Sequence, residues 1–193
     1  APMNIDGKAW RTIWLEPDGR AVGVIDQTLL PHQFTTRTLR SCAEAADAIS
    51  TMVVRGAPLI GVTGAYGLML ALQADPSDGA LAAAFEQLNA TRPTAINLRW
   101  ALERVRALVQ QLPQAERAEA ARLEAAAIAD EDVAMGEAIG EHGLAIFHQL
   151  AARKPGARLN VLTHCNAGWL ATVDWGTALA PIYKTHRAGL NIH

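Results

Sequence analysis

Two short apolar segments near the end of the chain constrain the fold more than any other feature. Residues 159–162 are typical of a buried strand, and Leu190-Asn-Ile-His193 resembles the first residues of another. A helical pattern, from about Trp169 to His186, separates them. Parallel strands must be joined by a crossover, so this order predicts two neighbouring strands of a parallel sheet. We therefore expect an α/β chain whose sheet is completed by a longer protein or by another chain.

A cysteine stands where the first of these strands ends. The turn Thr163-His-Cys-Asn-Ala-Gly168 connects the strand to the predicted helix, and ligands bind at this edge of open α/β sheets. A helix N-terminus there favours a thiolate or a bound anion, which makes Cys165 a candidate functional residue. A buried structural thiol is the alternative. If extended geometry continues through the turn, His164 and Cys165 point to opposite faces, so a direct Cys–His pair is not expected.

Composition bounds the class of protein. Half of the 193 residues are hydrophobic and 19% are charged, so a sizeable core is available. The net charge of −2, with scattered basic residues, gives no footprint for nucleic acid. Cys42 and Cys165 do not form a disulfide framework, which favours a reduced cytoplasmic compartment, with Cys42 used in packing. The start of the chain is unlike a signal peptide. The apolar segment 57–74 is interrupted by glycines and indicates a buried helix, so no membrane span is expected.

The first 120 residues indicate a small β-plus-helix domain. Pro17-Asp-Gly19 between two β-rich runs predicts a hairpin over residues 9–26, and Phe34–Leu39 is expected to add a strand. Apolar spacing predicts helices over 41–53, 59–73, 81–89 and 96–112, followed by a long helix over 115–140 and another over 141–153. The long helix is expected to cross from this domain, 1–120, into a second unit, 121–193. Asp130-Glu-Asp132 is interpreted as its solvated face.

A second candidate site precedes the predicted helix 59–73. In Arg55-Gly-Ala-Pro58 a glycine beside an arginine can present N–H groups and a guanidinium to an anion, although an ordinary loop salt bridge is the alternative. Three glycines follow at three-residue spacing and indicate tight helix packing. A dinucleotide fingerprint is rejected, since no strand precedes them. The glycines are Gly61, Gly64 and Gly67.

A third candidate is Arg92, in the loop between two predicted helices. An arginine close to the N-terminus of the later helix can clamp a phosphate, but the loop position by itself favours an ordinary surface arginine, because loops lie on the surface. The histidines have no metal-ligand spacing with cysteines or carboxylates, so no metal is predicted.

Four ordered blocks together resemble the methylthioribose-1-phosphate isomerases of methionine salvage, a branch of the initiation-factor-2B alpha/beta/delta-like superfamily. The blocks are Met52–Gly67, Thr91–Leu98, Ile139–Gly143 and Leu162–Gly168, and the amino end, Asn4-Ile-Asp-Gly with Arg11-Thr-Ile-Trp14, is similar too. The resemblance covers essentially the whole chain. It implies a β-plus-helix domain followed by the first, incomplete part of a Rossmann-like domain, in a cytoplasmic homodimer.

The resemblance also implies roles for single residues. Arg55, Gly56 and Ala57 would contact the phosphate of a sugar phosphate substrate, Arg92 would be a second substrate-binding arginine, and Cys165 would be catalytic. An aspartate as proton donor and a substrate-binding glutamine are expected further along the protein than residue 193. No cofactor is implied. Trp169 and Trp175 stand where many relatives carry other residues, which leaves the 5-substituent of the substrate open.

Three other functions are weighed against this one. A regulatory module of the same superfamily would sense a sugar phosphate or nucleotide without catalysis, and Cys165 with the paired arginines argues against it. An isomerase for a related 5-substituted (deoxy)ribose 1-phosphate would use the same residues. An unrelated cysteine hydrolase would need a base near Cys165, and His164 is expected to point away.

Overall fold

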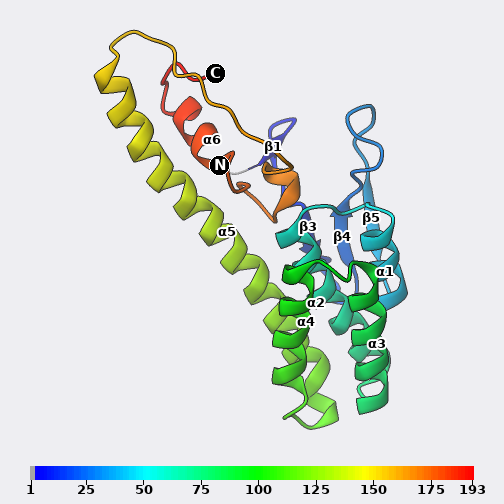
Figure 1. Ribbon diagram of the computed structural model, residues 1–193. Coiled ribbons are helices and arrows are strands. Elements are labelled where there is room, and N and C mark those ends of the chain that lie inside the picture. The colour runs from blue at the N-terminus through cyan, green and yellow to red at the C-terminus, as the bar shows by residue number, and fades with distance from the viewer. Residues whose placement is uncertain (1–2) are drawn as a thin grey trace.

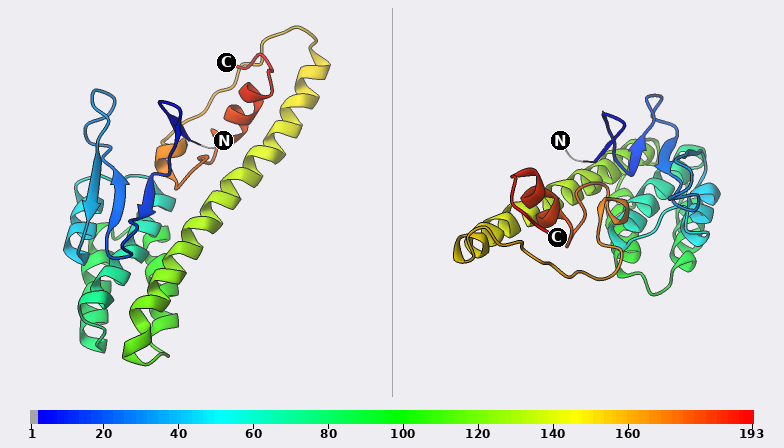
Figure 2. Two further views of the ribbon diagram at one scale, coloured as in Figure 1. Left: turned by 180° about the vertical axis from the view of Figure 1, so that it is seen from behind. Right: turned by 90° about the horizontal axis from the view of Figure 1, so that it is seen from above.

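A computed structural model of the chain describes residues 3–193. A three-stranded antiparallel sheet lies beside a layer of helices, and one long helix extends beyond both and carries the last helix of the chain (Figures 1 and 2). The strands are β1 Asn4–Ile5, β2 Lys8–Ala9, β3 Ile13–Leu15, β4 Val22–Ile25 and β5 Thr36–Leu39. The helices are α1 Cys42–Ser50, α2 Ala57–Ala74, α3 Asp78–Thr91, α4 Ile96–Val109, α5 Gln114–Arg153, the short 3₁₀ helix η1 Trp169–Ala171, and α6 Ala180–Arg187.

The predicted hairpin is confirmed. β3 and β4 pair antiparallel with Trp14 opposite Gly23, and β5 pairs with the other edge of β4. The turn between β3 and β4 holds Gly19 at φ +68°, and the Gly19 N–H donates to the carbonyl of Glu16 at 2.9 Å. Glycine reaches this backbone conformation without steric cost, so the sequence places the turn correctly.

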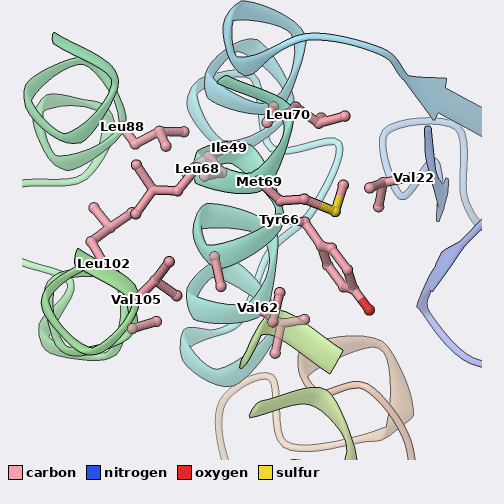
Figure 3. Packing of buried hydrophobic residues seen from close by; sticks show 14 of the residues in the cluster. Val22, Ile49, Val62, Tyr66, Leu68, Met69, Leu70, Leu88, Leu102 and Val105 are labelled. Atoms are coloured by element: carbon pink, nitrogen blue, oxygen red, sulfur yellow. The ribbon is translucent and has the colours of Figure 1, made fainter. Parts of the chain in front are cut away.

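Helix α2 is the centre of the core. It packs against α1, α3, α4 and α5, and its side chains are buried over most of its circumference. Figure 3 shows Leu88 of α3 and Leu102 and Val105 of α4 on one side of it, and Val22 of β4 on the other. A β-carbon on Gly64 would lie 2.5 Å from Leu98 Cδ1, which confirms that the glycines permit close packing.

Among the described residues, α2 is also the one helix long and apolar enough to cross a membrane. Of its 18 residues, 72% are buried inside the structure, which is the pattern of a core helix.

The two helices predicted over 115–153 form one. Helix α5 runs unbroken for 40 residues, and the predicted boundary at Gly140 is wrong. The glycine there serves packing, because a β-carbon on it would lie 2.8 Å from the side chain of Lys184 on α6. At Gly143 the corresponding distance to Pro181 Cβ is 2.4 Å. Glycine in a helix is tolerated where a neighbouring element comes this close.

The continuous helix predicted from Trp169 to His186 is wrong. Only η1 and α6 are helical, and irregular backbone connects them. Thr172 and Asp174 use their side chains to bond the local backbone: Thr172 Oγ1 accepts from Gly176 N at 3.0 Å, and Asp174 Oδ1 accepts from Trp175 N at 2.7 Å. Such bonds compete with helix formation.

The parallel pairing predicted near the end is confirmed as a single bridge between Leu159 and Ile192. The N–H groups of Leu159 and His193 donate to Asn191 and Leu159 carbonyls, both at 2.8 Å. The buried strand predicted over 159–162 is wrong beyond this bridge, because no strand forms there and Leu162 is 97% exposed. The described residues therefore form a mixed α/β fold with small antiparallel sheets and one parallel bridge.

Candidate functional site

The start of α2 packs directly against η1. Gly56, the residue before the helix, has φ +114°, and a β-carbon on it would lie 2.4 Å from both Cα and the carbonyl oxygen of Ala171. Any other residue would be strained in this conformation and would also collide with η1. The Arg55–Pro58 loop predicted as a site is therefore held against the segment that follows Cys165.

This helix N-terminus has the features of an anion site. No side chain of residues 3–193 caps it, and Pro58 lies in its first turn, as predicted. Uncapped N–H groups and the helix dipole favour a negatively charged group at this position. Helix α2 is 18 residues long, so its dipole is well developed.

The two sequence-predicted loops meet at Asn166. Its Nδ2 donates to the backbone carbonyl of Arg55 at 3.4 Å. A hollow of about 270 Å³ lies at this junction, and the Arg55 side chain is exposed to solvent beside it. The hollow is lined by Gln27, Leu30, Pro31, Arg55, Asn166 and Leu170. Arg55 and the turn that contains Cys165 thus belong to one surface.

Cys165 is exposed and lies in the turn with φ +70°. Its Sγ is 3.2 Å from Nδ1 of His164. The expectation that these neighbours point to opposite faces is wrong, because that argument assumed extended backbone and Cys165 is in the left-handed region. The alternative of a buried structural thiol does not hold for Cys165. Cys42 is half-buried: it packs against the core, and burial raises its pKa to about 11.

Hydrogen bonds join η1, which follows the turn, to residues of the β-strand region. Thr12 Oγ1 donates to the Trp169 carbonyl at 3.1 Å, and Gln27 Nε2 donates to the Leu170 carbonyl at 2.7 Å. Gln27 is a buried polar residue that sequence reasoning missed, and only its position just after β4 could have drawn attention to it. These bonds fix η1, and with it the wall against which Gly56 packs.

Arg92 lies at the same end of the helical layer. Helices α2 and α3 run antiparallel through a short connection, so the end of α3 lies beside the start of α2 (Figure 1). Arg92 is the residue that ends α3, and its carbonyl accepts from Ala95 N at 2.9 Å. Within residues 3–193 no hydrogen bond or ion pair joins its side chain to Arg55 or to Cys165.

Asp132 differs from the solvated face predicted for 130–132. Its Oδ2 accepts from Val173 N at 2.7 Å, and burial raises the pKa of this carboxyl above its ordinary value of 3.8. Asp130, by contrast, is exposed and pairs with Arg11 at 2.7 Å. Across the described residues, no group of three His, Cys, Asp or Glu side chains could hold a metal ion.

The two tryptophans flank this region on different elements. The Trp169 ring centroid lies 4.5 Å from that of Tyr183 on α6. Trp175 is buried under Lys184, whose Nζ lies 4.3 Å from the Trp175 ring centroid. Trp169 therefore packs against α6, and Trp175 lies between α5 and α6, where its Cβ is 3.1 Å from the β-carbon position of Gly136. Their effect on substrate preference stays a prediction.

Comparison with known proteins places this arrangement in a family. The chain is 58% identical over 191 residues to the methylthioribose-1-phosphate isomerase of Rhodospirillum centenum and 62% identical over 191 residues to that of Methylobacterium nodulans. Each match covers 99% of the chain and 51% or 52% of the relative. The chain thus spans about half the length of the curated relatives it matches.

Solved structures share the fold. The 5-methylthioribose 1-phosphate isomerase of Pyrococcus horikoshii matches with a TM-score of 0.80 and 37% identity, over 95% of this chain and 51% of that one. The translation initiation factor eIF-2B subunit delta from A. fulgidus matches with a TM-score of 0.79 and 35% identity, over 96% and 53%. The sequence model of the Initiation factor 2 subunit family matches residues 53–193, so the chain belongs to the initiation factor 2 subunit family.

Proposed function

We propose that the complete protein is an aldose–ketose isomerase that converts 5-methylthioribose 1-phosphate to 5-methylthioribulose 1-phosphate in methionine salvage. Eight relatives with this enzyme name are 55–62% identical to the chain. The single structural observation that carries the proposal is the junction of the Arg55 loop with the exposed Cys165 turn through Asn166.

The phosphate is assigned to the start of α2. Gly56 and Ala57 would offer backbone N–H groups there, and Arg55 would add charge-assisted hydrogen bonds. Arg92, at the same end of the helical layer, would be the second arginine. An anion at this position gains from the α2 dipole and from two guanidinium groups, which together suit a phosphate monoester.

Cys165 is assigned to the reacting carbons. The substrate carries its phosphate on the anomeric carbon, so the ring cannot open freely to an aldehyde. An acid must protonate the ring oxygen, and a hydrogen must move from C2 to C1. Cys165 would act as the base or shuttle if the hydrogen moves as a proton through a cis-phosphoenolate, or as a polar group beside the developing cation if it moves as hydride. The acid is expected to be an aspartate further along the protein.

We extend the proposal to the organisation of the protein. Residues 1–120 would form the β-plus-helix domain, and 121–193 would begin a Rossmann-like domain. The parallel bridge between Leu159 and Ile192 supports the second part. A cytoplasmic homodimer without a cofactor follows from the family resemblance.

A second candidate is a regulatory subunit that binds a sugar phosphate or nucleotide without catalysis. The similarity to the eIF-2B subunit delta favours it. A purely regulatory function, however, gives no role to the exposed thiol of Cys165 beside the predicted anion site.

Substitution of the cysteine separates these functions. In the complete protein, we expect Cys165→Ser to lower the turnover of 5-methylthioribose 1-phosphate by ~100-fold or more with substrate affinity retained, because it removes a group that acts on the reacting carbons. Cys42→Ala is the matched control and should keep the activity. Turnover near that of the wild type in Cys165→Ser would refute the catalytic role.

A further inference from the structure

We propose that His164 is the positioning residue for Cys165, and that the two side chains share one exchangeable proton. The proposal rests on the isomerase function above, since it assigns a proton partner to the proposed catalytic thiol. The main observation behind it is the distance of 3.2 Å between Cys165 Sγ and His164 Nδ1 in the exposed turn.

The backbone of Cys165 makes this contact available. Two successive residues of a strand direct their side chains to opposite faces. Cys165 has φ +70°, in the left-handed region that residues other than glycine seldom adopt, and such conformations gather at functional sites. In this turn, the residue with the unusual backbone conformation is also the residue whose Sγ contacts His164 Nδ1.

The turn is held in place without the histidine. The carbonyl of Ala167 accepts from the N–H groups of Thr177 at 3.0 Å and Leu179 at 3.3 Å. On the other side, Asn166 donates to the Arg55 carbonyl. The turn therefore keeps its anchors when the imidazole is changed, and the effect of the imidazole on the thiol can be measured by itself.

Among residues 3–193, Arg55 and Tyr183 are charged or titratable residues on the elements packed against the turn. The backbone carbonyl of Arg55, in the loop before α2, accepts from Asn166, and the Arg55 side chain is exposed beside this contact. The hydroxyl of Tyr183 on α6 lies 2.8 Å from the β-carbon that Gly168 would carry. Arginine stays charged and cannot accept a proton. Burial raises the pKa of Tyr183, so its phenol stays protonated. An imidazole is the group that exchanges a proton near neutral pH.

The proposed proton transfer takes place between Cys165 and His164 alone. The Sγ–H bond breaks as the Nδ1–H bond forms, which leaves a thiolate and an imidazolium in contact, and no oxidant or second reactant is consumed. The thiolate is the form of cysteine that can accept a proton from a substrate carbon. When the proton returns from Nδ1, the pair is restored for the next turnover.

The test measures the thiol directly in the complete protein. Alkylation of Cys165 by iodoacetamide is followed by peptide mass spectrometry from pH 5 to pH 10 in the wild type and in His164→Gln and His164→Asn, which keep polarity but take up no proton. At pH 6 we expect both variants to react at least ~10-fold more slowly than the wild type, with equal rates at pH 10, where an exposed thiol is ionised with or without a neighbouring imidazole. Unchanged profiles in both variants would overturn the proposal.

Three controls distinguish the effect of the His164 imidazole on the thiol from the effects of other groups and of unfolding. His148→Gln changes an exposed histidine on α5 and should leave the profile unaltered. Cys42 reports whether each variant is folded, because this half-buried thiol with a raised pKa should react more slowly than Cys165 in the folded protein. If Arg55→Gln slows alkylation at pH 6 as much as His164→Gln, the arginine and not the histidine governs the thiol, and the proposal fails.

Activity gives the second readout. We expect His164→Gln to lower kcat for 5-methylthioribose 1-phosphate by ~10-fold or more with KM within about twofold, as a proton-transfer partner should. Loss through KM alone would indicate a structural role and contradict the proposal. If the wild type does not turn over this substrate while the alkylation profiles still differ, the proposed function fails and the His164–Cys165 pair stands.

Discussion

The carboxylate of Asp132 accepts a hydrogen bond of 2.7 Å from the backbone N–H of Val173. This bond joins the middle of α5 to the irregular segment after η1. The next residue, Asp174, accepts in turn from the N–H groups of Met3 at 2.9 Å and Trp175 at 2.7 Å. A half-buried carboxylate, Asp132, and a buried one, Asp174, thus hold together three parts of the chain that lie far apart in the sequence.

Stability should depend on pH through Asp132. Burial raises the pKa of its carboxyl, the Val173 N–H opposes the increase and the nearby Asp174 adds to it. Between the ordinary value of 3.8 and the raised value, the folded protein binds more protons than the unfolded chain, so the free energy of unfolding falls as pH rises through this window. Asp132→Asn cannot ionise, and urea denaturation from about pH 3 to pH 7 should show the variant gaining stability relative to the wild type as pH rises.

An exposed carboxylate on the same helix provides the control. Asp130 is 67% exposed and forms an ion pair with Arg11. Asp130→Asn should change the free energy of unfolding by less than ~1 kcal/mol. If the difference between Asp132→Asn and the wild type is constant over the whole pH range, the Asp132 carboxyl does not have a raised pKa in the folded protein.

Gly56→Ala should disrupt the packing of α2 on η1. Its φ of +114° disfavours any side chain, and the new β-carbon would lie 2.4 Å from Ala171 backbone atoms. We expect a loss of at least ~2 kcal/mol in the free energy of unfolding, since strain and collision add. Gly19→Ala is the matched control: Gly19 also has positive φ but has no other atom within 4 Å of its β-carbon position, so it should lose only ~1 kcal/mol. Equal losses in chemical denaturation would show that the contact with η1 contributes nothing.

Arg117 should contribute strongly to stability although it is charged. Its side chain is buried and donates to the carbonyls of Leu112 at 3.1 Å and Pro76 at 3.0 Å, and to the exposed Asp78 at 2.7 Å. Arg117→Met leaves both carbonyls without their donor and should cost ~2–4 kcal/mol. Asp78→Ala removes only an exposed carboxylate and should cost less than ~1 kcal/mol. Thermal or urea unfolding measures both; comparable costs would mean that the ion pair, and not the carbonyl contacts, stabilises this corner.

Elements with local signals were predictable from the sequence. The hairpin turn needs the positive φ that Gly19 supplies, and α1 begins at Ser41, whose Oγ accepts from Glu44 N at 3.1 Å. Helices α1 to α4 follow their apolar spacing to within a few residues. The Arg55 loop and the Cys165 turn were both identified, because each stands at the boundary of an element.

Elements fixed by distant partners were not predictable in the same way. The sequence predicts a helix end at Gly140, but in the structure α5 continues there and α6 packs against the glycine. The sequence also predicts a helix over residues 172–176, but hydrogen bonds of Val173 with Asp132 and Thr12 hold this segment in irregular backbone. The contact between Cys165 and His164 depends on a single backbone angle that no spacing rule supplies. In each case a tertiary contact overrides the local preference.

The phosphate role of Arg55 gives the last prediction. Its guanidinium is exposed at the start of α2, where a bound phosphate would receive charge-assisted hydrogen bonds. In the complete protein, Arg55→Gln should weaken binding of 5-methylthioribose 1-phosphate by ~10-fold or more, the effect of losing hydrogen bonds to a charged group. Arg20→Gln, at an exposed arginine of the β3–β4 turn, is the matched control and should leave affinity unchanged. Calorimetry with inorganic phosphate added as a competitor checks the assignment: the competitor should displace substrate from the wild type, and equal affinity in Arg55→Gln and the wild type would exclude Arg55 from the phosphate site.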